Sequence, residues 1–260
     1  FQRINCYPVQ MKIQAISKTI SKLDKQDPTP VETWVKESIL MLESVLPIIV
    51  QLKCDSYTDD QIAELESLLQ HNVYSGDKNQ IWTGQSLVDM NLLNYAKDIE
   101  AIYHRNACEC NLQKKLIVMQ TRLDKMEVQI AQDREITYRI NNLDDCADFL
   151  EDLVITTSVC LQSHFVSNFK DEYVVFHEKV QRYLQLIQWI SVFQKEGLRL
   201  RSFYTNPKIT RHLHQGFKHF NVVDESWRSL IKLGRSDNLM TSLLSSSRLK
   251  NLEIINNAVT

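Results

Sequence analysis

The chain has 260 residues, enough for one large domain or two of ordinary size. It contains only five Gly and five Pro, which argues against β-sandwiches, barrels and doubly wound sheets, because these folds need many tight turns. The formal net charge of −2 supplies no basic field for nucleic acid or for an anionic membrane surface.

The N-terminal residues predict two helices separated by a break. Residues Val9–Asp24 carry apolar side chains at a spacing of three to four, which is typical of an amphipathic helix. The segment Thr29–Glu32 supplies a Thr N-cap, a Pro suited to the first turn and a Glu that completes a capping box. The next helix is therefore expected from about Val31, and Pro47 should kink or restart it.

The following region alternates helices with one loop. A third helix is predicted to open within Ser56–Asp60 and to run through His71, and Val73–Gln85 has the Gly and Asn content of a surface loop. Ser86 and Asp89 can cap another helix. Its apolar stripe comprises Leu87, Met90, Leu93, Ile99 and Ile102, and a further helix carries Leu112, Leu116, Met119 and Leu123. We expect Asn106 with Glu109 to recap the helix where the chain changes direction.

The hydrophobic period changes from helical to alternating after residue 125. Met126–Ile130 and Ile136–Ile140 both alternate, and five polar-leaning residues separate them, so they predict a β-hairpin. A lone hairpin is marginally stable, so it must pack on neighbouring helices. Asn142 is expected to cap the next helix, from Leu143 to about Ser163.

The longest predicted element starts near Asn168. Apolar side chains recur there every seven residues and fill two seam positions through four heptads, which implies lengthwise packing of helix on helix. The two seams comprise Phe169, Phe176, Tyr183 and Ile190, and Tyr173, Val180, Ile187 and Gln194. At 1.5 Å per residue, a helix of about 35 residues reaches roughly 50 Å.

The C-terminal part predicts three shorter helices. Asn206–Pro207 suits a cap and first residue, and Gly216 is expected to end that helix. Val222–Leu233 and Arg248–Thr260 form the other two, with Gly234–Asn238 as the turn between them. The sequence as a whole predicts a mainly α fold, an elongated stack of antiparallel helical bundles with one small β-hairpin, and a soft boundary near Asn141–Asn142.

One stretch, from Trp189 to Trp227, carries large apolar residues that suit anchors between helices rather than catalysis. An anchor Trp is followed five residues later by Gln. A Phe closes the helix, a polar-Ile pair opens the next, and the pattern Phe-x-x-Val-Asp-x-x-Trp-Arg follows. In this sequence these positions are Trp189, Gln194, Phe203, Lys208-Ile209, Phe220, Val223-Asp224 and Trp227-Arg228.

This pattern resembles the junction between tail and linker in dynein heavy chains. The resemblance covers roughly residues 40–260 and continues upstream through Ala107–Glu109, Leu150–Asp152 and Ser163 with Phe165. Two positions depart from the family: Gly197 stands where a second Trp is usual, and an Arg-His-Trp run is absent near Thr58–Glu64. The chain is identified as a divergent member.

The resemblance implies a fold, a role and partners. Residues 1–141 would form a tail-base helical bundle that includes the hairpin, and residues 142–260 the N-terminal linker bundle. The segment would be non-catalytic and would transmit the ATP-driven movement of a downstream AAA+ ring to tail and cargo in microtubule-based movement. ATP and Mg²⁺ would bind only in the parent motor, so this segment would hold no cofactor. The implied structural anchors are Trp189, Gln194, Phe203, Phe220, Asp224, Trp227 and Arg228.

The implied partners are the rest of the heavy chain with its ring, and dynein intermediate or light chains. Microtubules would be reached only through the parent motor, in the cytoplasm, the cytoskeleton or a ciliary axoneme. The six Cys form no disulfide framework, which fits a reducing compartment. Since the chain starts at Phe1 without Met and stops at Thr260 within a predicted helix, we expect it to be a fragment.

Several residue groups invite a chemical interpretation. Gly76–Lys78 and Gly84–Ser86 lack the spacing of a phosphate-binding loop, so ATP binding is not expected. Cys108 and Cys110 with His104 could suit zinc, but two Cys two residues apart diverge on a helix, and ordinary packing is the favoured alternative. The chain has no apolar run of membrane-spanning length, since Val45–Leu52 is too short.

The remaining polar groups favour structural roles. His212, His214 and His219 are expected to form a partly exposed cluster that can titrate near neutrality, because no further ligand completes a tetrahedral site. Paired carboxylates occur at Asp144-Asp145 and Glu151-Asp152, of which the first pair suits the positive end of a helix. Ser245–Ser247 suits a linker or N-cap.

Two alternatives stay open. Trp82 lies in a predicted loop and is the aromatic residue most suited to contact a partner. The alternative to a dynein segment is a helical scaffold or tether of spectrin-like bundles with no motor attached.

Overall fold

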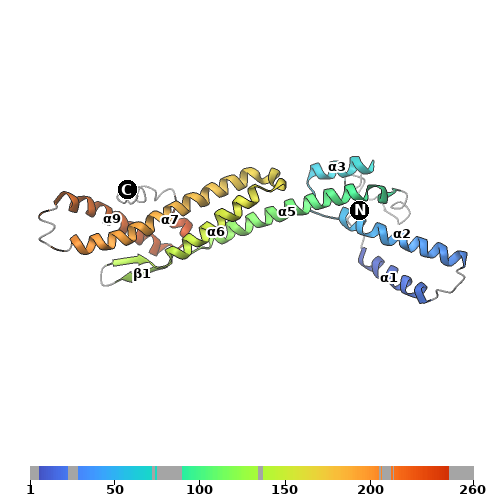
Figure 1. Cartoon of the computed structure of the whole chain (residues 1–260), viewed down its shortest axis with the longest axis horizontal. Coiled ribbons are helices and arrows are strands. Elements are labelled where there is room, and N and C mark those ends of the chain that lie inside the picture. Colours follow the sequence, from blue (N-terminus) through green and yellow to red (C-terminus); the bar gives the residue numbers. More distant parts are fainter. Residues whose placement is uncertain are drawn as a thin grey trace. The chain divides into compact units, whose positions relative to one another are not determined.

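A computed structural model describes residues 6–22, 29–71, 74, 90–133, 137–204, 206, 212 and 214–245. These residues are mainly helical, with one two-stranded antiparallel hairpin, as the sequence predicts (Figure 1). The chain forms two compact units, residues 1–111 and 112–260. Of the helices that the structure describes, none has the length and apolarity needed to cross a membrane.

The first unit is built on capped helices. It contains α1 (Cys6–Lys22), α2 (Pro30–Leu52), α3 (Asp59–Leu69), the 3-10 turn η1 (Leu92–Tyr95) and the beginning of α5 (Ala96–Asp124). The Thr29–Glu32 capping box is present, and a second box joins Thr58 to Gln61 at the start of α3. The core contains Val45, Ile48, Ile49, Leu52, Tyr57, Leu65, Leu69, Met90, Leu92, Ile99 and Ile102.

Of the two outcomes predicted at Pro47, a kink or a restart of the second helix, the restart does not occur. Helix α2 continues through Pro47 to Leu52, although proline removes one backbone donor. Val45 before the proline and Ile48 after it are both buried in the same core. This shared burial holds the two halves of the helix together, because each buried aliphatic side chain contributes about 1.5–3 kcal/mol.

Asn106 and Glu109 do not recap a helix either, since α5 is continuous around them. Their side chains instead bond to other parts of the first unit. The Asn106 amide donates to Ser56 Oγ at 3.0 Å, and Glu109 accepts from Gln61 at 3.0 Å. Both residues are buried, and a buried polar group needs such a partner. The two residues therefore match the capping pattern, but their side chains form tertiary hydrogen bonds instead.

The second unit is a helical bundle with the hairpin against it. It contains the end of α5, α6 (Leu143–Leu161), the 3-10 helix η2 (His164–Phe169), α7 (Lys170–Tyr204), α9 (His214–Ser236) and α10 (Met240–Leu243). Helices α6 and α7 run side by side in opposite directions (Figure 1). The buried seam of α7 contains Tyr173, Phe176, Val180, Ile187 and Ile190, which confirms lengthwise helix packing.

The hairpin exists, but its first strand differs from the prediction. Strands β1 (Ile130–Asp133) and β2 (Thr137–Ile140) pair antiparallel with Ile130 opposite Ile140. The alternating residues before Ile130 pair with a different segment, because Glu127 forms a bridge with Leu239. Val128 N–H donates to Asn238 O at 2.7 Å, and Met240 N–H donates to Met126 O at 2.8 Å. Alternation correctly indicated extended backbone, but it could not identify which partner the backbone pairs with.

The glycines of the C-terminal part do not end helices as predicted. Gly216 and Gly234 both lie inside α9, which begins at His214 and ends at Ser236. Gly234 is buried, and a Cβ there would lie 2.7 Å from Ile130 Cδ1 and 3.1 Å from Leu243 Cδ1. This glycine is explained by the close packing of α9 on β1 and α10 rather than by a turn.

Some sequence predictions lie wholly or partly outside the described residues. These are the loop Val73–Gln85 with Trp82, the Ser86–Asp89 cap, the helix start at Pro207 and the helix Arg248–Thr260. Of the predicted Ser245–Ser247 linker, Ser245 alone is described. The side chains of His214 and His219 are likewise outside the description, whereas His212 is exposed.

The compact units divide at Asn111 and Leu112, whereas the sequence places its soft boundary at Asn141–Asn142. The reason for the difference is that the hairpin packs on α9 in the second unit. Helix α5 runs through the division, so the backbone there gives no loop or composition signal. The assignment of residues 1–141 to the tail base and 142–260 to the linker stays a prediction.

The buried thiol of Cys146 predicts a loss of stability at alkaline pH. Burial, reinforced by the Asp145 carboxylate, raises the pKa of this thiol from 9.0 to about 11. The unfolded chain therefore loses the proton first as the pH rises, and the folded state loses about 1–2 kcal/mol between pH 9 and pH 11. The urea midpoint should fall over this window, and Cys146→Ala should make the fall shallower. A profile no shallower than that of Cys108→Ala, at a half-buried thiol, would contradict this assignment.

Candidate functional site

The predicted anchors are best examined where the C-terminal half of α7, helix α9 and the hairpin meet in the second unit. We call this region the α7–α9 junction. It is defined by side chains from two helices and by the backbone of one strand residue: Phe193, Gln194 and Arg201 of α7, Asp224, Trp227 and Arg228 of α9, and Ile140 of β2.

Trp227 supplies the apolar contact of the junction. Its side chain is 4% exposed, and its ring lies 5.4 Å from that of Phe193, centroid to centroid, at a tilt of 49°. A tilted aromatic pair at this distance contributes beyond the area it buries. Leu230 and Ile231 on the same helix are also buried, so this part of α9 joins the core of the bundle.

Gln194 joins α7 to the hairpin through two hydrogen bonds to one residue. Ile140 N–H donates to Gln194 Oε1 at 2.7 Å, and Gln194 Nε2 donates to Ile140 O at 2.9 Å. The adjacent Asn141 N–H donates to Gln129 across the hairpin, so the N–H and C=O of Ile140 point away from β1. The amide of Gln194 therefore pairs the outer edge of β2 as a neighbouring strand would.

Asp224 joins α7 to α9 electrostatically. It is 7% exposed and accepts from Arg201 of α7 and from Arg228 of its own helix, the latter at 2.7 Å. The Arg201 side chain is 18% exposed, whereas that of Arg228 is 61% exposed. A carboxylate buried to this extent needs such partners, because desolvation without them costs several kcal/mol.

Three of the predicted anchors contribute differently. Trp189 is half-buried and packs against the core of the second unit. Phe220 is half-buried, and Phe203 is 45% exposed near the end of α7. The junction therefore brings together Gln194, Asp224, Trp227 and Arg228.

Sequence reasoning missed the main role of Asn142. This residue precedes α6, but its side chain makes no cap bond to the helix. Instead Gln129 N–H donates to Asn142 Oδ1 at 2.7 Å, and Asn142 Nδ2 donates to Glu127 O at 2.9 Å. These two hydrogen bonds attach the residues just before β1 to the start of α6, and Asn142 is buried between them. In the sequence, the only indication of this role was the position of a polar residue next to an alternating segment. Capping of α6 explained that position equally well.

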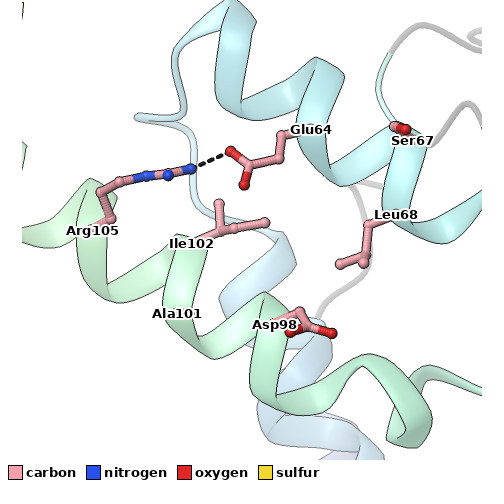
Figure 2. A pocket seen from close by; sticks show the side chains of 7 residues that line it. All are labelled: Glu64, Ser67, Leu68, Asp98, Ala101, Ile102 and Arg105. Carbon is pink, nitrogen blue, oxygen red and sulfur yellow. Dashed lines mark hydrogen bonds and ion pairs between the residues drawn. The ribbon is translucent and has the colours of Figure 1, made fainter.

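The first unit has a separate cavity of about 440 Å³ between α3 and α5. Figure 2 shows Arg105 and Glu64 reaching toward each other, with Ile102 and Leu68 below them and Asp98 on the next turn. The two charged side chains are 40% and 49% exposed, so their ion pair contributes at most about 1 kcal/mol. The lining of this open cavity mixes charged side chains with Ile102 and Leu68, and we assign no chemistry to it.

The other candidate groups make contacts that fit structural roles rather than metal binding or catalysis. Cys108 Sγ lies 3.8 Å from His104 Nδ1, whereas Cys110 is directed to Asn106 at 3.6 Å, so the two thiols diverge. Within the described ranges, no three His, Cys, Asp or Glu side chains are grouped to hold a metal ion. Asp144 and Asp145 lie in the first turn of α6, where a negative charge is favourable.

The chain matches a known protein family over its full length. The profile described as "Dynein heavy chain, N-terminal region 2" matches residues 1–260. Dynein axonemal heavy chain 12 of Rattus norvegicus is 23% identical over 157 residues, which cover 60% of this chain. Dynein axonemal heavy chain 6 of Homo sapiens is 21% identical over 224 residues, or 85% of this chain. The matched part spans 5% of the length of each relative.

Proposed function

This chain belongs to the dynein heavy chain family, and from this premise we propose that it is a non-catalytic mechanical segment of a microtubule motor. It comprises the base of the tail and the start of the linker. In this proposal an AAA+ ring elsewhere in the heavy chain changes shape with its nucleotide, and the segment carries that displacement to tail and cargo. ATP and Mg²⁺ act in the ring and not in this segment.

The observation that supports this role best is the clamp of Gln194 on Ile140. A segment that transmits force must resist relative movement of its elements, and α7 is the element with the greatest reach, about 52 Å for 35 residues. The clamp attaches α7 to the hairpin by a pair of directed bonds, while Trp227 and Asp224 attach α9 to α7. Apolar burial is non-directional, whereas paired hydrogen bonds fix orientation.

The proposed partners follow from this role. They are the remainder of the heavy chain with its ring, and dynein intermediate or light chains. Contact with microtubules occurs only through the parent motor, and no nucleic acid is involved. Because the relatives above are named axonemal heavy chains, we propose a place on the cytoskeleton, with the ciliary axoneme as its site.

The role is tested by separating ATP turnover from movement in a full-length heavy chain that carries this segment. The variant Gln194→Met removes the clamp while keeping the length of the side chain. We expect ATP turnover to be retained and the velocity of microtubule gliding to fall. The reason is that α7 and the hairpin would move relative to each other, so that less of the displacement of the ring would reach the tail. Gln188→Met, at an exposed position of the same helix, is the matched control.

Two results would contradict the proposal. The first is an unchanged gliding velocity in Gln194→Met, once hydrogen exchange has shown that the clamp is open. The second is saturable ATP binding by the 260-residue chain alone. The alternative of a scaffold without a motor is favoured by no specific contact among the described residues, and the heavy-chain relatives weigh against it.

A further inference from the structure

A cationic groove lies on the outer side of the α7–α9 junction. It encloses about 340 Å³, and its lining comprises Tyr138, Arg201, Trp227, Arg228, Ile231, Lys232 and Arg235. Four of these side chains are cationic and none is acidic. The chain as a whole has a net charge of −2, so this concentration of positive charge is local.

Helix α9 creates the groove through its spacing. Arg228, Lys232 and Arg235 follow one another at intervals of four and three residues, so they share one face of the helix. Like charges at these intervals destabilise an isolated helix by about 0.2–0.5 kcal/mol per pair. The repulsion is relieved when anions bind between the cations, so the stripe is better suited to a bound state than to a free one.

The positive charge of the groove is only partly neutralised within the chain. Asp224 is shared between Arg201 and Arg228. The Nε atom of Arg201 is buried and has no hydrogen-bond acceptor among the described residues. Arg235 lies over the ring of Tyr138, with 4.6 Å between its guanidinium carbon and the ring centroid. This contact orients Arg235 without neutralising it, because an aromatic ring carries no net charge.

The floor of the groove is apolar. Trp227 and Ile231 line it although they are 4% and 3% exposed, so only their outer edges face the cavity. A free phosphate ion has no apolar group that could contact such a floor. A nucleic-acid base would need an exposed aromatic face on which to stack. A side chain of leucine size fits an apolar floor, and carboxylates on both sides of it fit the rim, because guanidinium and carboxylate groups form paired hydrogen bonds.

We propose that this groove docks a carboxylate-rich peptide segment in which one apolar side chain lies between acidic residues. The apolar side chain contacts Trp227 and Ile231, and the flanking carboxylates contact Arg228, Lys232 and Arg235. The proposal identifies a partner by its chemistry and is independent of whether the segment transmits force.

The test measures the fluorescence anisotropy of a labelled peptide mixed with the 260-residue chain. The peptide has one Leu with three Glu on each side, and matched peptides replace the Glu by Gln or the Leu by Ser. We expect the Glu peptide to bind, the Gln peptide to lose binding and the Ser peptide to bind more weakly. Raising the salt from about 0.05 M to about 0.3 M should weaken binding, because exposed charges are screened.

The site is located with charge reversals that leave the core intact. Lys232 is exposed, so Lys232→Glu should preserve the fold and lower the affinity about tenfold, by removing one attraction and adding one repulsion. Lys170→Glu, at the opposite end of α7, is the matched control and should leave the affinity unchanged. Circular dichroism verifies that both variants fold.

Four outcomes would overturn the proposal. They are no binding of the Glu peptide at low salt, equal binding of the Glu and Gln peptides, equal losses in Lys232→Glu and Lys170→Glu, and equal binding of the Leu and Ser peptides. Competition by inorganic pyrophosphate at the same concentration as unlabelled peptide would likewise overturn it, since this would indicate a simple anion site. None of these outcomes bears on the gliding experiment, so the two proposals fail separately.

Discussion

Replacement of Trp227 by alanine is expected to lower the free energy of unfolding of the second unit by about 3–5 kcal/mol. The side chain is 4% exposed and touches the ring of Phe193, so its removal loses apolar burial, an aromatic contact and close packing at once. The surrounding helix cannot readily collapse into the gap, because Asp224 on the same helix is paired with Arg201 of α7.

The measurement is urea unfolding followed by circular dichroism at the helical minimum, which does not depend on tryptophan fluorescence. Hydrogen exchange in α7 assigns the transition to the second unit. Trp34→Ala is the matched control, because Trp34 is 67% exposed and its removal should change stability by at most about 0.5 kcal/mol. A loss below about 1 kcal/mol for Trp227→Ala would place this residue outside the anchoring scheme.

The sequence predicted the long helices well because their signal is repeated many times. Helix α7 shows this most clearly: its length agrees with the prediction, and most of the predicted seam is buried, although Phe169 lies in η2 and Tyr183 is half-buried. Each repeat adds independent evidence for the same period, so a single polar residue such as Gln194 does not hide it. The helix starts at Thr29 and Thr58 were also predictable, since a capping box is a local arrangement of residues three apart.

The sequence failed where a residue serves a distant partner. Asn106 and Asn142 were interpreted as caps, yet both bond to backbone or side chains of other segments. Gly234 was interpreted as a turn, yet it allows α9 to approach Ile130. In each case the local pattern was compatible with a local explanation. The three-dimensional partner lies outside the local pattern, 13 residues away in the case of Asn142 and 50 in the case of Asn106, and it leaves no periodic trace.

The candidate site was predicted in part, and the reason lies in residue type. Trp227 stands out in a sequence because a large aromatic residue in an apolar helical stripe is costly to expose. Gln194, Asp224 and Arg228 were named only through the resemblance to dynein heavy chains. Ile140 does not stand out, because its role is performed by its backbone. The cationic groove combines α7, α9 and β2, so no single stretch of sequence contains it.

Replacement of Gln194 by methionine is expected to cost about 2–4 kcal/mol, because it leaves the N–H and C=O of Ile140 without partners in a buried place. Ile140 is 1% exposed, so water cannot replace the lost bonds without opening the junction. Methionine keeps the length and nearly the volume of glutamine, so the loss reports hydrogen bonding rather than a cavity. Urea unfolding measures the free energy, and the exchange rate of the Ile140 amide locates the effect.

Gln194→Asn separates the length of the side chain from its chemistry. Asparagine keeps both the donor and the acceptor but is one methylene shorter, so it cannot reach both groups of Ile140 from the same position on α7. We therefore expect it to lose most of the stability that the methionine variant loses, and to speed exchange of the Ile140 amide similarly. If Gln194→Met differed from wild type by no more than the exposed control Gln188→Met, and the Ile140 amide exchanged at its original rate, the directed attachment of α7 to the hairpin would be refuted. In that case the contacts of Trp227 and Asp224 with α7 would be the links that hold the described part of the junction together.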